Sequence, residues 1–238
     1  MLPYCWHILK EYVKSFFHLL YPHICLHCGT EQLTDKQVLC SNCIIKLPYT
    51  DFFFMQDNAV EKIFWGRTKI AAAGALLFFT KDSIVQVLIF ELKYKQHKKA
   101  GLLLGNLIGM ELSKLKKFNS IDFLIPIPIS AKKARSRSFN QAQIICEGIL
   151  QFWPGKKITN NLKKINTGLT QTHKDRVQRG MTKLPIFYLQ RPEVLCNKNL
   201  LLVDDVVTTG ATIESACICL EVAKPKTISL ATAAYTLN

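Results

Sequence analysis

Two adjacent acidic residues, Asp204 and Asp205, end an apolar run and are followed by a loop of hydroxyl-bearing and small residues. Residues 200–212 read LLLVDDVVTTGAT. If the run is a strand and a helix follows the loop, backbone N–H groups at the start of the helix can converge on a phosphate, and the glycine permits close backbone approach. The predicted anion-binding residues are Val206, Thr208, Thr209, Gly210, Ala211 and Thr212.

The two carboxylates at the mouth of this loop would repel a phosphate unless they bind something else. Carboxylate oxygens suit sugar hydroxyls or Mg²⁺. A ribose with a phosphate attached satisfies both halves of the pattern. The alternative is an ordinary strand–turn–helix in which Thr208 or Thr209 only caps the helix, but that reading leaves the paired acids unexplained. A Walker A loop is excluded because the sequence has no G-x-x-x-x-G-K-[ST] motif.

Four of the nine cysteines form two CxxC pairs, Cys25 with Cys28 and Cys40 with Cys43. A CxxC turn directs two sulfur atoms at one metal ion, so two such turns joined by a short hairpin close a tetrahedral four-thiolate site. The alternatives are two disulfides, which a reducing cytoplasm disfavours, or a redox pair, which normally needs only one CxxC. The spacing therefore predicts a structural zinc.

The positive charge of the chain is concentrated in one segment. The formal net charge is +14, and residues 91–183 hold 19 Lys and Arg against 5 Asp and Glu, whereas the rest of the chain is balanced. Such a segment either forms solvated helix ends and loops or surrounds a polyanion, which would be a phosphorylated metabolite or a nucleic acid. Charge alone does not separate these alternatives.

Length and composition indicate a globular chain with one sizeable domain and a small appendage. The 238 residues are 49% hydrophobic and 20% charged. We expect an amphipathic helix over residues 1–20, a zinc module over 21–50 and the main domain over 60–238. No uncharged apolar run reaches the roughly 20 residues of a membrane span, and the N-terminus has neither a basic start nor an A-x-A-like cleavage site, so a cytoplasmic location is expected.

The main domain alternates strand-like and helical patterns. Strands are predicted at 70–79, 121–129, 199–203 and 226–234, and helices at 83–94, 101–117, 140–152 and 212–222. In the first of these helices Val85, Leu88, Ile89 and Leu92 share one face. This alternation predicts an α/β fold with a largely parallel sheet, whose ligands bind beyond the carboxyl ends of the strands. The aromatic stretch 49–55 has no period that assigns it.

Several motifs occur together in this chain. They are the double CxxC, LKYK at 92–95, PIPIS at 126–130, RSFNQ at 137–141, the segment 171–179 and DDVVTTGAT at 204–212. In combination they resemble the ComF family, competence-associated proteins of the type I phosphoribosyltransferase kind. The chain departs from the family's usual pattern at Gln96 and Ser138, where glycine is common.

The resemblance implies a type I phosphoribosyltransferase-like sheet with an N-terminal zinc module. By analogy with that signature, Asp204 and Asp205 would hold the ribose 2′ and 3′ hydroxyls, and residues 208–212 would hold the 5′-phosphate of phosphoribosyl pyrophosphate. Mg²⁺ would accompany the pyrophosphate, and the PIPIS turn would face it. The basic residues implied to close over the leaving group, and so to act in catalysis, are Arg137, Arg176 and Arg179.

Two functional classes remain open from the sequence. The first is a phosphoribosyltransferase of nucleoside metabolism that transfers ribose 5-phosphate to or from a base or amine. The second is a non-catalytic competence accessory that binds single-stranded DNA and serves the DNA-uptake machinery, with the phosphoribosyl site used for sensing or for gripping a 5′-phosphate. Trp153, Phe139 and Phe187 are the aromatic candidates for base stacking, although core packing is the commoner fate of such residues.

Overall fold

The computed structural model describes residues 22–34, 37–153, 157–158, 160–165 and 186–237. The chain divides into two compact units, Met1–Leu47 and Pro48–Asn238. The smaller unit contains the double CxxC and the short helix α2 (Ser41–Ile45). The helix predicted for residues 1–20 lies outside the described residues.

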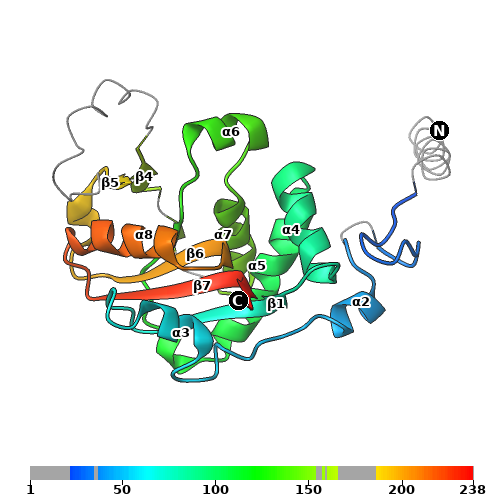
Figure 1. Ribbon diagram of the computed structural model, residues 1–238, viewed down its shortest axis with the longest axis horizontal. Coiled ribbons are helices and arrows are strands. Elements are labelled where there is room, and N and C mark those ends of the chain that lie inside the picture. The colour runs from blue at the N-terminus through cyan, green and yellow to red at the C-terminus, as the bar shows by residue number, and fades with distance from the viewer. Residues whose placement is uncertain (1–21, 35–36, 154–156, 159, 166–185, 238) are drawn as a thin grey trace, which may run out of the picture. The chain divides into compact units, whose positions relative to one another are not determined.

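A parallel sheet forms the centre of the larger unit (Figure 1). In the described part of the chain its strand order is β1-β7-β6-β2-β3, and each neighbouring pair is parallel. The strands are β1 (Ala73–Phe79), β2 (Phe123–Pro126), β3 (Lys157–Ile158), β6 (Asn199–Val207) and β7 (Thr227–Thr236). A separate antiparallel pair consists of β4 (Leu162–Lys164) and β5 (Phe187–Leu189). The predicted α/β class with a largely parallel sheet is confirmed.

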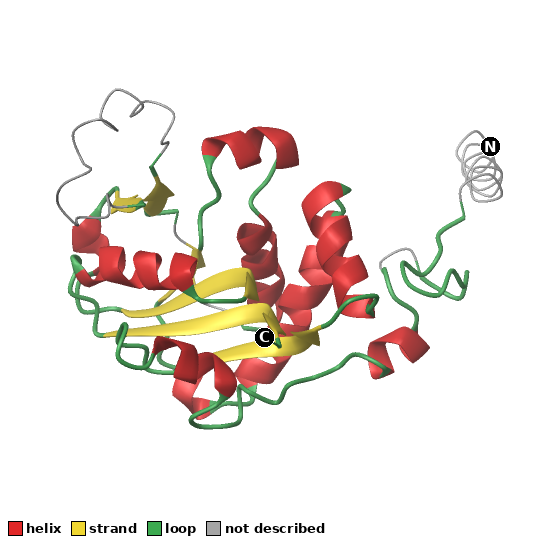
Figure 2. Cartoon of the chain, in the orientation of Figure 1, coloured by secondary structure: helices red, strands yellow, loops and turns green. Residues whose placement is uncertain are grey.

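Helices cover both faces of this sheet (Figure 2). They are α3 (Ala59–Phe64), α4 (Ile84–Tyr94), α5 (Lys98–Ser113), α6 (Ala131–Arg137), α7 (Gln141–Phe152) and α8 (Ala211–Glu221), with short 3-10 turns at Lys116–Phe118 and Pro192–Leu195. On one face, α3 and α8 share a core cluster with Leu200 and Leu202 of β6. Helices α5 and α7 lie behind the sheet in the same view.

Helix α4 buries the face that the sequence predicted. Its Val85, Leu88 and Leu92 side chains are fully buried. The Ser83 hydroxyl accepts a hydrogen bond of 3.2 Å from the Gln86 N–H, which satisfies one of the free donors at the helix start. The opposite face of α4 is more exposed, and Lys93 lies in the last turn of the helix.

Several predicted boundaries differ from the structure, and three of the differences bear on the site or on packing. The helix predicted at 101–117 begins earlier and ends at Ser113, because the chain turns there to bury Phe118. The strand predicted at 121–129 ends at Pro126, as expected for a segment with prolines that lack an N–H donor. Strand β6 continues to Val207, beyond its predicted end at 203, and its acidic residues keep their place in the register with β7.

The aromatic stretch after the small unit lies along the sheet edge. Tyr49 forms an isolated antiparallel bridge with Leu77 of β1, and the Thr50 N–H donates to the Leu76 carbonyl at 3.1 Å. The Phe52 ring meets Phe78 edge-on, with ring centroids 5.5 Å apart. Because an exposed edge strand invites pairing with other chains, this segment protects β1.

Helices α5 and α7 approach each other closely at glycines. A Cβ atom at Gly105 would lie 2.1 Å from the Ile145 carbonyl oxygen and 2.8 Å from the Gly148 Cα. These are backbone atoms of α7 and cannot rotate away as a side chain would. The absence of a side chain at Gly105 therefore sets the spacing of the two helices behind the sheet.

We expect Gly105→Ala to lower the free energy of unfolding by about 1 to 3 kcal/mol, because the added methyl group would force the helices apart. Urea unfolding followed by circular dichroism measures this change. Alanine favours a helix over glycine by about 1 kcal/mol, so a neutral or stabilising result would contradict the close contact. Met110→Ala, on the exposed side of the same helix, is the control.

Candidate functional site

The two acids lie inside strand β6, and the loop after them is short. Asp204, Asp205 and Val206 belong to β6, which corrects the prediction that the strand ends before the acids. Residues 208–210 then connect β6 to α8 at the carboxyl edge of the sheet. In this kind of sheet ligands bind at that edge, so the fold places the acid pair and the loop where a site is expected.

The loop leaves the start of α8 open. Gly210 occupies the N-cap position with φ 73°, and among the described residues no side chain makes a capping hydrogen bond to α8. Thr208, Thr209 and Thr212 are exposed. The alternative in which a threonine serves only as a cap is therefore wrong. The first N–H groups of α8 are therefore not used by a side-chain cap, and three exposed hydroxyls lie on the same segment, as an anion site requires.

Gly210 is needed for a different reason than the one the sequence suggested. A Cβ atom there would lie 2.6 Å from the Ile63 Cγ2 and 2.8 Å from the Phe64 Cε1, both on α3. The glycine thus packs the rear of the loop against α3, and its positive φ is a conformation that β-branched residues avoid. Replacing it would disturb the loop from behind and would not simply fill the opening.

Arg67 holds the loop from the same side. Its Nη1 donates to the Thr209 carbonyl at 2.9 Å and to the Ile63 carbonyl at 3.2 Å, and its other terminal nitrogen forms an ion pair with Glu214 in the first turn of α8. Arg67 therefore ties α3, the loop and α8 together. No motif in the sequence marks this residue, because its partners are carbonyls and one distant carboxylate.

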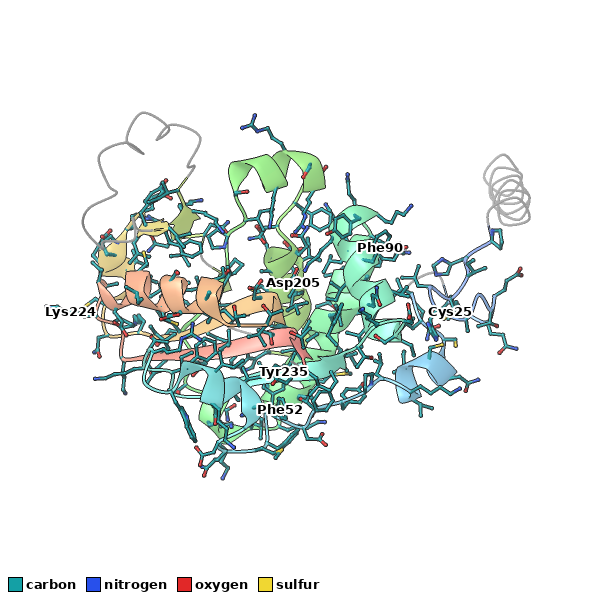
Figure 3. The ribbon with its side chains drawn as sticks, in the orientation of Figure 1. Cys25, Phe52, Phe90, Asp205, Lys224 and Tyr235 are labelled. Carbon is teal, nitrogen blue, oxygen red and sulfur yellow. The ribbon has the colours of Figure 1, made fainter. Side chains whose placement is uncertain are left out.

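Lysines surround the two carboxylates. The Lys93 ammonium of α4 lies 3.0 Å from the Asp205 Oδ2, and the two side chains are only 21% and 13% exposed. The Asp205 N–H donates to the Asp204 Oδ1 at 2.9 Å. Figure 3 shows Asp205 at the end of the sheet that α4 and α6 flank. Lys164 of β4 also acts electrostatically on Asp204.

Burial and repulsion between like charges shift the pKa values of Asp204 and Lys164. Burial and the neighbouring Asp205 carboxylate raise the pKa of Asp204 to about 7, although Lys93 and Lys164 oppose the shift. Burial and the charge of Lys133 lower the pKa of Lys164. A ligand group that donated hydrogen bonds or carried positive charge would reduce the repulsion between the two carboxylates. The pair is therefore suited to bind polar or cationic ligand groups.

Arg137 is the predicted catalytic arginine that the structure describes. Its Nη1 donates to the Gln141 Oε1 at 3.2 Å, and its guanidinium lies 5.5 Å from the centre of the Tyr94 ring on α4. It lies at the end of α6, whose first residue follows the PIPIS turn. The Asn140 amide donates to the Ile127 carbonyl at 3.0 Å and so fixes that turn to α7. The other two predicted arginines, Arg176 and Arg179, lie outside the described residues.

A mainly apolar groove of about 720 Å³ opens between α8 and β5, next to the loop. Its wall includes Lys164, Ala211 and Thr212, so the groove adjoins the start of α8. Phe187 is 2% exposed and Trp153 is 5% exposed, so neither offers a free face for base stacking. Of the three aromatic candidates, only Phe139 is partly exposed.

The four clustered cysteines of the small unit fit a tetrahedral metal site. Their sulfur atoms all lie within 4.8 Å of one another, and the Cys28 and Cys40 sulfurs are 3.6 Å apart. Zinc–thiolate bonds of about 2.3 Å place the sulfurs about 3.8 Å apart in a tetrahedron. All four cysteines are free of disulfides. Figure 3 shows Cys25 and its neighbouring sulfur atoms, whereas the His23 ring is engaged by the Gln37 carbonyl at 2.6 Å.

Protonation of these thiols also indicates a cation site. Burial alone would raise the pKa of Cys25, but hydrogen bonds from the N–H groups of Cys28, Cys40 and His27 outweigh it and lower the pKa to about 6. Burial and the neighbouring sulfurs raise the pKa of Cys43 to about 12. A bound Zn²⁺ would favour the thiolate form of Cys43, whose proton the neighbouring sulfurs otherwise retain.

Comparisons with known proteins agree with this geometry. Residues 157–237 match the phosphoribosyl transferase domain. DNA utilization protein YhgH of Escherichia coli O157:H7 is 25% identical over 198 residues, 80% of each chain. Competence protein ComFC of Streptococcus pneumoniae is 33% identical over 115 residues, 48% of each chain. Competence protein F of Haemophilus influenzae is 23% identical over 212 residues, 86% of this chain and 78% of that protein.

The parallel sheet, the loop after β6 and the domain match define a protein of the type I phosphoribosyltransferase-like class. With its four-cysteine cluster and its competence-protein relatives, the chain is similar to proteins of the ComF family. Across the part of the chain that the structure describes, no helix has the length and apolar character that crossing a membrane requires.

We expect one zinc ion per chain, bound by Cys25, Cys28, Cys40 and Cys43. Metal analysis of the purified protein measures it. The double variant Cys25→Ser, Cys40→Ser should lose the metal, because two of the four thiolates would be missing. The double variant Cys196→Ser, Cys219→Ser, which changes two cysteines outside the cluster, is the control. Zinc-free wild type, or equal zinc in the cluster variant, would refute the site.

Proposed function

We propose that the protein binds phosphoribosyl pyrophosphate, or another ligand with a ribose 5-phosphate moiety, at the carboxyl edge of β6. Asp204 and Asp205 accept hydrogen bonds from the ribose hydroxyls, and residues 208–212 bind the 5-phosphate. The observation that supports this most is the placement of a carboxylate pair and an uncapped helix start on one continuous strand–loop–helix segment. Neither half alone selects a sugar phosphate, whereas together they match its hydroxyls and its anionic end.

The finer proposal is transfer of the ribose 5-phosphate group. Loss of pyrophosphate from the anomeric carbon leaves an oxocarbenium-like cation, so the site must stabilise the leaving anion and exclude water. We assign stabilisation of the leaving group to Arg137, at the end of α6, and to the PIPIS turn that precedes this helix. We assign the apolar groove beside α8 to a base or amine acceptor. Mg²⁺ held mainly by diphosphate oxygens, within reach of carboxylate ligands, would neutralise part of the leaving group. The free thiols of the chain suit the reducing cytoplasm in which we place this activity.

Changing both acids to Asn should weaken the binding of phosphoribosyl pyrophosphate by more than about tenfold, because hydrogen bonds to charged acceptors contribute about 1.5 to 3 kcal/mol each. Isothermal titration calorimetry measures the affinity, and thermal unfolding checks the fold.

The matched control is Asp51→Asn, Asp57→Asn, which removes the same charge at two exposed positions. Both residues adopt a positive φ, and Asn tolerates that conformation as well as Asp does. Equal affinity in the wild type and both double variants would mean that the segment is only a structural turn.

A second function, binding of single-stranded DNA, is favoured by the exposed surface of α4 and α6. Phe90 and Tyr94 are 47% and 63% exposed, with ring centroids 5.1 Å apart. Arg137 lies over Tyr94, and Lys98 lies 5.6 Å from the centre of the Phe139 ring. Aromatic faces beside basic side chains are the combination that stacks bases while attracting the backbone. Relatives bear DNA utilization and competence names.

We expect weak binding of a fluorescent oligothymidine, with an affinity that falls steeply as salt rises. Phe90→Ala, Tyr94→Ala should weaken it by about tenfold or more, since base–aromatic stacking contributes about 1 to 3 kcal/mol per base. Fluorescence anisotropy measures the affinity. Trp65→Ala, an exposed aromatic on another surface, is the control. Binding that ignores salt, or that is unchanged by the double variant, would rule out this surface.

A further inference from the structure

One lysine contacts the acid pair directly, and two further lysines from other elements act electrostatically within the same cluster. Lys93 of α4 forms the 3.0 Å ion pair with Asp205, and Lys164 of β4 acts on Asp204. Lys133 of α6 acts in turn on Lys164. With two carboxylates and three ammonium groups, the cluster carries an excess of positive charge even when both acids are ionised.

Ribose hydroxyls do not account for these cations. A carboxylate accepts hydrogen bonds from hydroxyls without help from a lysine. The 5-phosphate could account for Lys164, which lines the same groove as Ala211 and Thr212 of its proposed site. Lys93, which pairs with Asp205, therefore either serves only to neutralise the acids or binds a second anionic group of the ligand.

The stereochemistry of phosphoribosyl pyrophosphate distinguishes these roles. Its diphosphate is attached to C1 in the α configuration, on the same face of the ribose ring as the 2- and 3-hydroxyls. A carboxylate that accepts these hydroxyls is therefore next to the diphosphate. An ammonium group that lies 3.0 Å from that carboxylate would therefore lie close to the diphosphate in the proposed binding mode.

We propose that Lys93 is a binding residue for the 1-diphosphate, and that it is held in place by Asp205 until the ligand arrives. This inference rests on the proposed function and extends it to ligand selection. In the free protein the ion pair keeps a largely buried ammonium and carboxylate satisfied. In the complex, Asp205 takes the ribose hydroxyls and Lys93 donates to the diphosphate. Lys93 then favours phosphoribosyl pyrophosphate over ribose 5-phosphate, which lacks the second anion.

The experiment compares two ligands on a set of variants. Calorimetric titrations with phosphoribosyl pyrophosphate plus Mg²⁺ and with ribose 5-phosphate give the ratio of the two affinities for the wild type, Lys93→Gln, Lys93→Arg and Lys95→Gln. Lys95→Gln is the matched control, because Lys95 is exposed and caps the C-terminus of the same helix. Thermal unfolding of each variant reports whether loss of the ion pair disturbs the fold.

We expect Lys93→Gln to bind phosphoribosyl pyrophosphate at least about tenfold more weakly while its affinity for ribose 5-phosphate changes by less than about threefold. Lys93→Arg should recover most of the selectivity, and Lys95→Gln should match the wild type. An equal loss for both ligands would make Lys93 only a counter-ion of the acids, and wild-type affinity for both ligands would remove it from the diphosphate site. Wild-type protein that binds neither ligand would instead overturn the proposed function.

Discussion

The site depends on how two adjacent, partly buried carboxylates are accommodated at the end of a central strand. Asp204 and Asp205 repel each other in a region of low dielectric, and the raised pKa of Asp204 expresses this cost. Lys93 opposes it directly, through a contact between α4 and β6 that joins two distant parts of the sequence. The position of α4 beyond the sheet is thus as much a part of the site as the strand that carries the acids.

The loop after β6 is supported independently of the acids. Helix α3 meets it from behind at Gly210, and Arg67 binds both a loop carbonyl and the first turn of α8. This support leaves the exposed side of the loop, with its hydroxyls and helix N–H groups, free for an anion. A phosphate bound there would also find the positive charge of Arg67 nearby, although Glu214 offsets much of that charge in the free protein.

Sequence patterns predicted the elements that have strong local signals. Helices α4 and α7 were placed to within a residue, because Ser83 and Asn140 cap them and their apolar faces are regular. Helix α3 was missed because six residues are too few to show a helical period, even though Asn58 caps it. Strand β6 was ended too early because acidic residues look like strand terminators. In the structure they continue the ladder with β7 at the edge where the strand leaves the core.

Only part of the candidate site could be predicted from the sequence, because some of its residues come from distant segments. Asp204, Asp205 and the loop are contiguous, so their roles follow from local spacing. Lys93 belongs to a recognisable motif, LKYK, but its partner is set by the packing of α4 against the sheet. Arg67 has no motif at all. Spacing along the chain can identify groups that act together on one segment, whereas ion pairs between segments are decided by tertiary packing.

Gln96 and Ser138 occupy positions at which glycine is common in the ComF pattern, and their backbone conformation gives a reason for that preference. Gln96 and Ser138 have φ values of 56° and 60°, the left-handed region in which glycine is favoured. Non-glycine residues held there cost on the order of 1 to 3 kcal/mol and persist only where the surroundings fix the backbone. Gln96 follows the helix that carries Lys93, and Ser138 follows Arg137. Both turns keep their conformation without glycine, so the constraint acts on where these two cationic helices end and not on the residue type in the turn.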